Sequence, residues 1–463
     1  MDAMIANRPM IRPQIVITGC GVVNPLGVNR DQFWAALRAG QTALRIEEAS
    51  ALAKEGATLL AQLRRGEDKS STETRYAAAR VGDFGAGQAI DASRRRRMPR
   101  LAQMTIVAAQ QALGVSRDPS MQADAGAVLS FYGAERVGVA LGTALGALDL
   151  TVEFMTQYLA SGLASASPAS FPYTVLNTPA ALVAMELGLR GPNVTVNHRD
   201  LSAAEALATA CELLACGRAD AVLAGGADEL SQSLLHAYRR FDCLARTDGL
   251  TGLQDEHVGS FSAPYDRTRH GLCPGEGAAL FLLERADTAA KRGAQVLARI
   301  AGYGRGGDVR PRIGWSSSVA DEAAAQTGAH AAISAALRTA GLRADQLDCV
   351  VGSGNGTELD RLESAVLRQA LSEDAERVRV VSLLGQSGEW PTSAACRVAQ
   401  ALFALQEQAL PRCHCPQPDE RAALPGLCIQ DESQAPLSAR VERVLVPCFA
   451  QGGGSVALML AQA

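Results

Sequence analysis

The chain alternates between continuous apolar runs and segments in which apolar residues recur with helical spacing. In the first part, apolar runs closed by glycine or polar residues predict buried strands at residues 14–23, 136–143, 193–197 and 221–228. Between these runs, helical periodicity predicts helices at residues 98–114, 179–189 and 204–217. Residues 45–90 show no clear period and carry many charges, so we expect an irregular surface insertion there.

The second part of the chain shows the same alternation of apolar runs and segments with helical periodicity. Apolar runs predict strands at residues 277–284 and 295–304, a strand that runs into a glycine loop at residues 347–356, and a strand, a glycine loop and a last strand at residues 441–462. Helical periodicity predicts helices at residues 331–342 and 393–410. Such alternation implies a layered α/β fold with buried parallel strands. A length of 463 residues favours two domains or two fused halves.

Composition and charge narrow the function. The formal net charge is −4 and aromatic residues make up 4%, which argues against a nucleic-acid or membrane-surface protein. No run reaches 18 apolar residues and the N-terminus has no signal-peptide layout, so we expect a cytoplasmic protein without a membrane span. The 11 cysteines are scattered in apolar runs, which favours small buried side chains over disulfides.

Common cofactor and metal motifs are missing or incomplete. In "GCGVVNPLG" the third glycine of a dinucleotide fingerprint is replaced by Asn24, and no phosphate-binding loop of the G-x-x-x-x-G-K type occurs. "CHC" at residues 413–415 lacks metal-ligand spacing and is interpreted as a surface loop. We therefore expect no cofactor and no metal. "SRRRRMPR" at residues 93–100 is either a solvated face or a docking patch for an acidic partner.

The junction before residue 204 carries the clearest chemical signal. A strand, a tight turn and a long small-residue helix follow one another in "NVTVNHRDLSAAEALATACELL", the usual setting of a nucleophile. The residue at the junction is Asp200, preceded by Arg199. Aspartate at this place suits a helix N-cap or an ion pair with Arg199, and the helix dipole would hold it as an anion. Three glycine loops at strand ends, residues 352–363, 385–395 and 449–456, could surround the same site.

Taken together, these motifs resemble the β-ketoacyl synthases, the condensing enzymes of fatty-acid and polyketide synthesis, along nearly the whole chain. "VITGCGVVNPLG" is similar to the family's opening strand, "RVGVALGTALGAL" to its G-T-G-x-G-G segment, and "PYDRTRHGLCPGEGAALFLLE" to its P-F-D-x-x-R-D-G-F block. The resemblance implies the thiolase fold, two similar α/β halves packed in five layers. It places the halves at residues 1–260 and 261–463.

The resemblance also locates the catalytic positions, and none of them is intact. The family's cysteine falls on Asp200, its two histidines fall on Ser353 and Glu389, and its gate phenylalanine falls on Gln451. The family's lysine falls near Leu384, and none of the chain's six histidines lies in either catalytic loop. A carboxylate lacks the thioester chemistry of a thiolate, so the chain is predicted to be an inactive homologue.

"ELDRLESAVL" at residues 358–367 is similar to a segment of chain-length factors, the ketosynthase β subunits of bacterial type II polyketide systems. Aspartate in place of their usual glutamine departs from the aromatic-polyketide members and leaves aryl-polyene and other polyene systems open. The resemblance implies a heterodimer with an active ketosynthase α subunit, served by an acyl carrier protein. Candidates for the tunnel wall and interface are Leu145, Leu148, Phe154, Phe171 and Tyr173. Ordinary core packing explains any one of them as well.

Two alternatives remain open at this point. One is a divergent acyltransferase or malonyl decarboxylase that uses Asp200 or Glu389. The other is a structural homodimer without a tunnel. The partner, the starter unit and the product length do not follow from the sequence.

Overall fold

A computed structural model describes residues 13–48, 75–115, 125–245, 263–308, 327–429 and 436–463. Ten strands form one mixed sheet in the order β10-β9-β13-β14-β8-β1-β7-β6-β4-β5. Its first five strands along the chain are β1 (Ile15–Val23), β4 (Val137–Gly142), β5 (Asn193–Val196), β6 (Ala221–Asp228) and β7 (Gly277–Arg285). The other five are β8 (Ala298–Gly307), β9 (Cys349–Val351), β10 (Arg379–Val381), β13 (Arg443–Phe449) and β14 (Gly454–Ala461).

The two sets of five strands have the same topology. In each set the first strand pairs with the fifth, the fifth with the fourth, the fourth with the second and the second with the third. The first two of these pairings are antiparallel and the last two are parallel in both sets. The sets meet where β1 pairs with β8. This repeat divides the chain between β7 and β8, later than the predicted division at residues 260 and 261, because β7 is the fifth strand of the first half.

The predicted parallel strands are therefore wrong for the middle of the sheet. β6 and β7 are almost completely buried, and so are β13 and β14, yet β6 runs antiparallel to β7 and β13 runs antiparallel to β14. Helices cover both faces of the sheet, so each strand is apolar on both sides whichever way it pairs. Hydrophobic pattern alone cannot distinguish the two directions.

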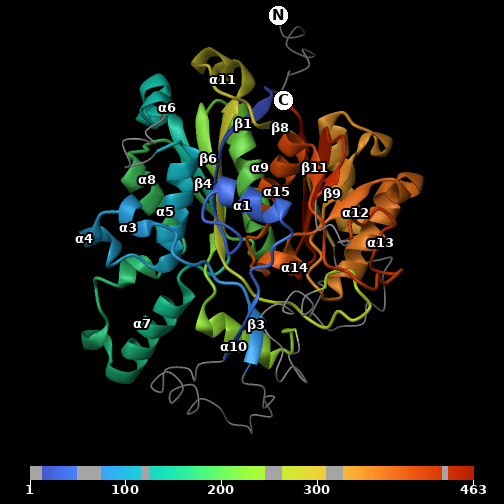
Figure 1. Ribbon diagram of the computed structural model, residues 1–463. Coiled ribbons are helices and arrows are strands. Elements are labelled where there is room, and N and C mark those ends of the chain that lie inside the picture. Colours follow the sequence, from blue (N-terminus) through green and yellow to red (C-terminus); the bar gives the residue numbers. More distant parts are fainter. Residues whose placement is uncertain (1–12, 49–74, 116–124, 246–262, 309–326, 430–435) are drawn as a thin grey trace, which may run out of the picture.

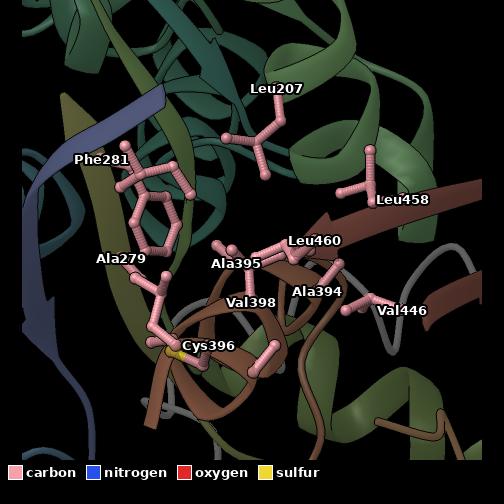
Figure 2. Packing of buried hydrophobic residues seen from close by; sticks show 14 of the residues in the cluster. Leu207, Ala279, Phe281, Ala394, Ala395, Cys396, Val398, Val446, Leu458 and Leu460 are labelled. Carbon is pink, nitrogen blue, oxygen red and sulfur yellow. The ribbon is translucent and has the colours of Figure 1, made fainter. Parts of the chain in front are cut away.

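The helices form three layers around the two halves of the sheet, as predicted for the thiolase fold (Figure 1). The outer layer of the first half contains α5 (Arg100–Ala112) and α8 (Thr178–Leu187), and that of the second half contains α12 (Thr327–Ala340) and α13 (Leu359–Leu371). Between the halves lie α9 (Ser202–Ala215) and α15 (Ala394–Glu407). Figure 2 shows this central layer, where Leu207 of α9 and Val398 of α15 pack against Leu458 and Leu460 of β14.

Further elements lie around these layers. The other α-helices of the described residues are α1 (Arg30–Arg38), α3 (Ala86–Ala89), α4 (Ala92–Arg95), α6 (Ala125–Tyr132), α7 (Leu148–Ser161), α10 (Gln232–Arg240), α11 (Ala286–Arg292) and α14 (Leu384–Ser387). Two small antiparallel sheets pair β2 (Arg45–Glu48) with β3 (Arg75–Ala78) and β11 (Ala409–Leu410) with β12 (Leu437–Ser438). Where it is described, the predicted surface insertion at residues 45–90 contains buried positions, Tyr76 to Ala79, and residues 49–74 lie outside the described residues.

Candidate functional site

The strand-to-helix junction has the tight turn that the sequence predicts. After β5 the chain passes through a short 3-10 helix, η5 (Arg199–Leu201), before α9 begins at Ser202. Arg199 has a φ of 48°, a left-handed conformation that side-chain-bearing residues adopt at some cost. The Ser202 hydroxyl accepts a hydrogen bond from the N–H of His198 at 2.9 Å and donates one to the carbonyl of Arg199 at 2.7 Å. These bonds hold the strained turn, so residue 200 has a fixed position.

Asp200 does not cap the helix. The N-cap residue of α9 is Leu201, which makes no side-chain cap hydrogen bond. Among the described residues no ion pair within 4.0 Å joins Asp200 to Arg199. Burial raises the pKa of the Asp200 carboxyl group, while the charge of Arg199 and the backbone N–H of Gln451 oppose that rise. The N-cap prediction is therefore wrong, because Leu201 and not Asp200 directly precedes α9.

Glu389 faces the same place from the second half of the chain. Its backbone N–H donates to the carbonyl of Cys273 and its own carbonyl accepts from Gly275, both at 2.7 Å, which fixes the segment before α15. Burial raises the pKa of Glu389 to about 8, the negative charge of Asp200 adds to the rise, and the charge of Arg397 opposes it. The Oε2 atom of Glu389 has no hydrogen-bond partner among the described residues.

Gln451 lies in the turn between β13 and β14, where its backbone N–H acts on the Asp200 carboxyl group. Its side-chain Nε2 is buried and has no partner among the described residues. Asp200 is thus close enough to interact with the backbone of Gln451 and with the charge of Glu389, which come from two other segments of the chain.

Ser353, the fourth position, is part of a buried structural network. Its N–H and its hydroxyl both donate to Oε1 of Glu363, at 2.7 and 2.9 Å. The other carboxylate oxygen of Glu363 accepts from the Tyr265 hydroxyl at 2.6 Å, and the N–H of Tyr265 donates to Asp360 at 2.7 Å. Leu384, near the predicted position of the family's lysine, is buried in the first turn of α14. The Ser353 hydroxyl is engaged by Glu363, and a leucine side chain has no proton to transfer.

The sequence analysis missed two buried titratable residues near Asp200 and Glu389, namely Asp228 and Tyr238. Asp228, at the end of β6, is completely buried and accepts hydrogen bonds from the hydroxyl of Thr143 and the N–H of Ala144, both at 3.0 Å; burial raises its pKa to about 6. Burial also raises the pKa of Tyr238 on α10, and the negative charges of Asp200 and Glu389 add to that rise. The only sequence signal was the aspartate that ends the strand "AVLAGGAD".

Among the described residues, the turn before α9 carries no cysteine. The nearest cysteine along α9 is Cys211, which is buried and has a pKa raised to about 12 by that burial. A thiol held neutral is a poor nucleophile, and a carboxyl group in its place forms no stable thioester. What remains is a cluster of carboxyl groups whose neutral forms are favoured by burial. Among the described residues no group of three or more histidine, cysteine or acidic side chains could hold a metal ion. Cys413 and Cys415, predicted to lie in a surface loop, are buried.

The predicted tunnel residues lie together at one end of the first half. Leu148 begins α7, and the rings of Phe154 in α7 and Phe171 in η4 (Phe171–Tyr173) are 5.8 Å apart. The N–H of Leu145 donates to Asp228 at 3.3 Å, which ties this region to the site. Leu145, Leu148, Phe154 and Tyr173 are half-buried, but Phe171 is 55% exposed, so this chain alone does not enclose a tunnel there.

Phe171 belongs to a group of exposed large apolar side chains that lie near one another in the sequence. The others are Met155, Tyr158 and Leu159 in α7, Leu163, Val175 and Leu176 between α7 and α8, and Met185 in α8. We call these seven residues and Phe171 the α7–α8 face. Beside it, β5 is the last strand of the ten-stranded sheet and pairs on one side only. An exposed apolar face next to an open strand edge marks an interaction surface. None of the described helices is long and apolar enough to span a bilayer.

The arginine run lies at α4, in front of α5. Arg94 pairs with Glu186 at 2.8 Å and Arg100 with Glu276 at 2.8 Å. Arg96 and Arg97 are exposed, so part of the run is compensated within the chain and part faces solvent.

Comparisons with known proteins agree with this fold. The family model "Beta-ketoacyl synthase, N-terminal domain" matches residues 12–289, and "Beta-ketoacyl synthase, C-terminal domain" matches residues 298–415. A putative polyketide β-ketoacyl synthase 1 from Streptomyces virginiae is 30% identical over 94% of this chain and 94% of that protein. The 3-oxoacyl-acyl-carrier-protein synthase 2 of Vibrio cholerae is 29% identical over 82% of this chain and 84% of that protein. Among solved structures, the ishigamide ketosynthase/chain length factor superposes with a TM-score of 0.78 at 22% identity, covering 98% of this chain and 100% of that one.

Proposed function

Since the chain belongs to the β-ketoacyl synthase family, we propose that it is a non-catalytic subunit of the chain-length-factor type, which pairs with an active ketosynthase. The observation that carries this proposal is Asp200, which stands in the fixed turn before α9 where the family places its cysteine. Glu389 and Ser353 stand at the two histidine positions. One replacement could be a variation, whereas loss of nucleophile and both histidines on a retained scaffold indicates a role other than condensation.

The α7–α8 face supports a partner subunit. It offers eight exposed large apolar side chains beside the open edge of β5, and such a surface is costly to leave in water. Phe171 belongs to this face, and the half-buried ring of Phe154 lies 5.8 Å from it. A partner covering this face would enclose these rings, and their bulk would then limit the length of the chain that grows on the partner.

The exposed arginines of the α4 run, Arg96 and Arg97, supply positive charge that suits an acidic acyl carrier protein. We propose that this patch steers the carrier protein to the complex. The products would be polyketide or polyene chains, whose length the α7–α8 face and its partner set together.

The test is co-expression with a homologue that has an intact cysteine and both histidines. We expect one heterodimer in size-exclusion chromatography, and acyl adducts by intact mass on the partner only. Acyl transfer to this chain, or turnover of a malonyl carrier protein by this chain alone, would refute the proposal.

A second function has one observation in its favour. Glu389, with a pKa raised to about 8 and an unpartnered Oε2 atom, has the properties of a proton donor in a divergent acyltransferase or decarboxylase. In that case Glu389→Gln would abolish turnover by the isolated chain.

The purely structural alternative makes a different prediction. The chain would then form a homodimer, and its elution volume in size-exclusion chromatography would not change when the ketosynthase is added.

A further inference from the structure

The turn between β4 and α7 is held from two opposite sides. The peptide that joins Thr143 to Ala144 donates its N–H to Oδ1 of Asp228 at 3.0 Å. The carbonyl of the same peptide accepts a hydrogen bond from Nδ2 of Asn197 at 2.9 Å. Asn197 donates a second bond to the carbonyl of Ala144 at 2.8 Å, and the Thr143 hydroxyl donates to Asp228 at 3.0 Å. Because the N–H and the carbonyl of a trans peptide point in opposite directions, one peptide of the turn is fixed at both ends.

The order of the strands explains this arrangement. β4 lies between β5 and β6 in the sheet and runs parallel to both. The carboxyl ends of neighbouring parallel strands meet at one edge of a sheet. Asp228 is the last residue of β6 and Asn197 directly follows β5, so the turn after the middle strand lies between these two side chains.

The next part of the chain is equally confined. Gly146 has a φ of 60°, and a Cβ atom added there would lie 2.9 Å from Cδ2 of Leu176, a member of the α7–α8 face. In the first turn of α7, the two carboxylate oxygens of Asp149 accept two backbone N–H groups from the start of α10, at 2.8 and 3.0 Å. Leu145 lies between these contacts and the peptide that is fixed at both ends, so its backbone has little freedom to move.

We propose that Asn197 is a positioning residue for product length: its amide holds the turn at residues 143–147, and the turn holds Leu145 at one depth in the tunnel wall. This inference rests on the proposed function, in which Leu145 lines the tunnel. Asn197 is exposed and directly follows β5, the edge strand of the sheet. A partner that covers β5 would exclude water from the two bonds of Asn197, and hydrogen bonds strengthen when water is excluded. Pairing would therefore fix the position of Leu145.

Asn197→Ala tests the proposal in the full-length chain, co-expressed with its ketosynthase. The variant should fold and pair, because Asn197 is exposed. Loss of two hydrogen bonds should make amide exchange across residues 143–148 about tenfold faster, measured by hydrogen–deuterium exchange and mass spectrometry. The products should change from one main length to a mixture that includes longer chains, because Leu145 is no longer held at one depth. A purely structural role of Asn197 would lower the melting temperature without changing the product length.

Two further variants make the test specific. Asn197→Asp has the same shape, but an ionised carboxylate only accepts hydrogen bonds, so this variant should behave like Asn197→Ala and replaces it if the alanine variant does not fold. Gln110→Ala is the matched control, because the side-chain amide of Gln110 donates to the carbonyl of Ala89 at 3.0 Å and not to the turn. It should leave both the exchange of residues 143–148 and the product length unchanged.

The outcomes separate this inference from the proposed function. A wild-type chain that forms no heterodimer would refute the proposed function and the inference with it. An intact heterodimer whose product length is unchanged in Asn197→Ala and Asn197→Asp would overturn the inference alone, and so would unchanged exchange in the turn. An equal change in Gln110→Ala would also overturn it.

Discussion

Glu389→Gln tests the electrostatics of the site most directly. Burial raises the pKa of Glu389 from 4.5 to about 8. A group whose pKa is raised by folding contributes stability that is fully present below its unfolded pKa and is lost as the pH rises through the folded pKa. Between pH 4.5 and 8 the wild type therefore loses stability because Glu389 ionises more readily in the unfolded chain. Glutamine has nearly the same shape and does not titrate, so the variant should lose less.

The magnitude follows from these two pKa values. Each pH unit between them corresponds to about 1.4 kcal/mol, and the loss levels off near pH 8. From about pH 6 to about pH 8, the stability of Glu389→Gln relative to wild type should rise by about 2 kcal/mol. For a chain of 463 residues, unfolding entropy is about 1 kcal/mol per °C, so the variant should gain about 2 °C in melting temperature over that range.

The assay is thermal unfolding of wild type and variant side by side in buffers across this range. Glu376→Gln is the matched control, because Glu376 is exposed and its substitution should give a difference that does not change with pH. A pH-independent difference for Glu389→Gln would refute the reasoning, since it would mean that water reaches the carboxyl group. A difference that grows towards low pH would give the wrong sign and would equally refute it.

Three further predictions concern the face, the tunnel and the buried network. Leu159→Asp in the α7–α8 face should abolish heterodimer formation in size-exclusion chromatography, whereas Phe241→Asp, at an exposed apolar residue outside that face, should not; equal effects would argue against the face. Phe154→Ala and Phe171→Ala should each lengthen the partner's products, measured by mass spectrometry, because each variant removes one of the two rings that pack together there. An unchanged product distribution for both variants would exclude the tunnel assignment. Tyr265→Phe should lower the free energy of unfolding by about 1–3 kcal/mol, because buried Glu363 loses its 2.6 Å hydrogen bond. Tyr158→Phe, at an exposed tyrosine, should leave stability unchanged in the same denaturation assay.

Much of the fold was accessible from the sequence because local patterns encode it. The strand predicted at residues 221–228 is β6, and the helix predicted at residues 204–217 lies over α9. Both segments are long and apolar, so the hydrophobic pattern of the sequence identifies them as buried elements. Strand direction was not accessible, because β6 and β7 look equally apolar whether they pair parallel or antiparallel.

The site was only partly accessible. Asp200, Glu389 and Gln451 were identified because each replaces a residue expected in a recognisable motif. Asp228 and Tyr238 were missed, since nothing in their local sequence marks them as neighbours of that site. Asp200 was expected to be the N-cap of α9, but the helix begins at Ser202 and its N-cap residue is Leu201.

The sequence by itself determined which chemical groups the chain possesses: a carboxyl group where a thiol is expected, and no histidine in the glycine loops. It also determined the order of strands and helices, because hydrophobic periodicity is a local property. Only the tertiary structure decided what those groups do. Asp200 interacts with the backbone of Gln451 and with the charge of Glu389, which lie in distant segments of the sequence. Protonation and hydrogen bonding depend on burial and on neighbours from distant segments, and no local pattern contains either.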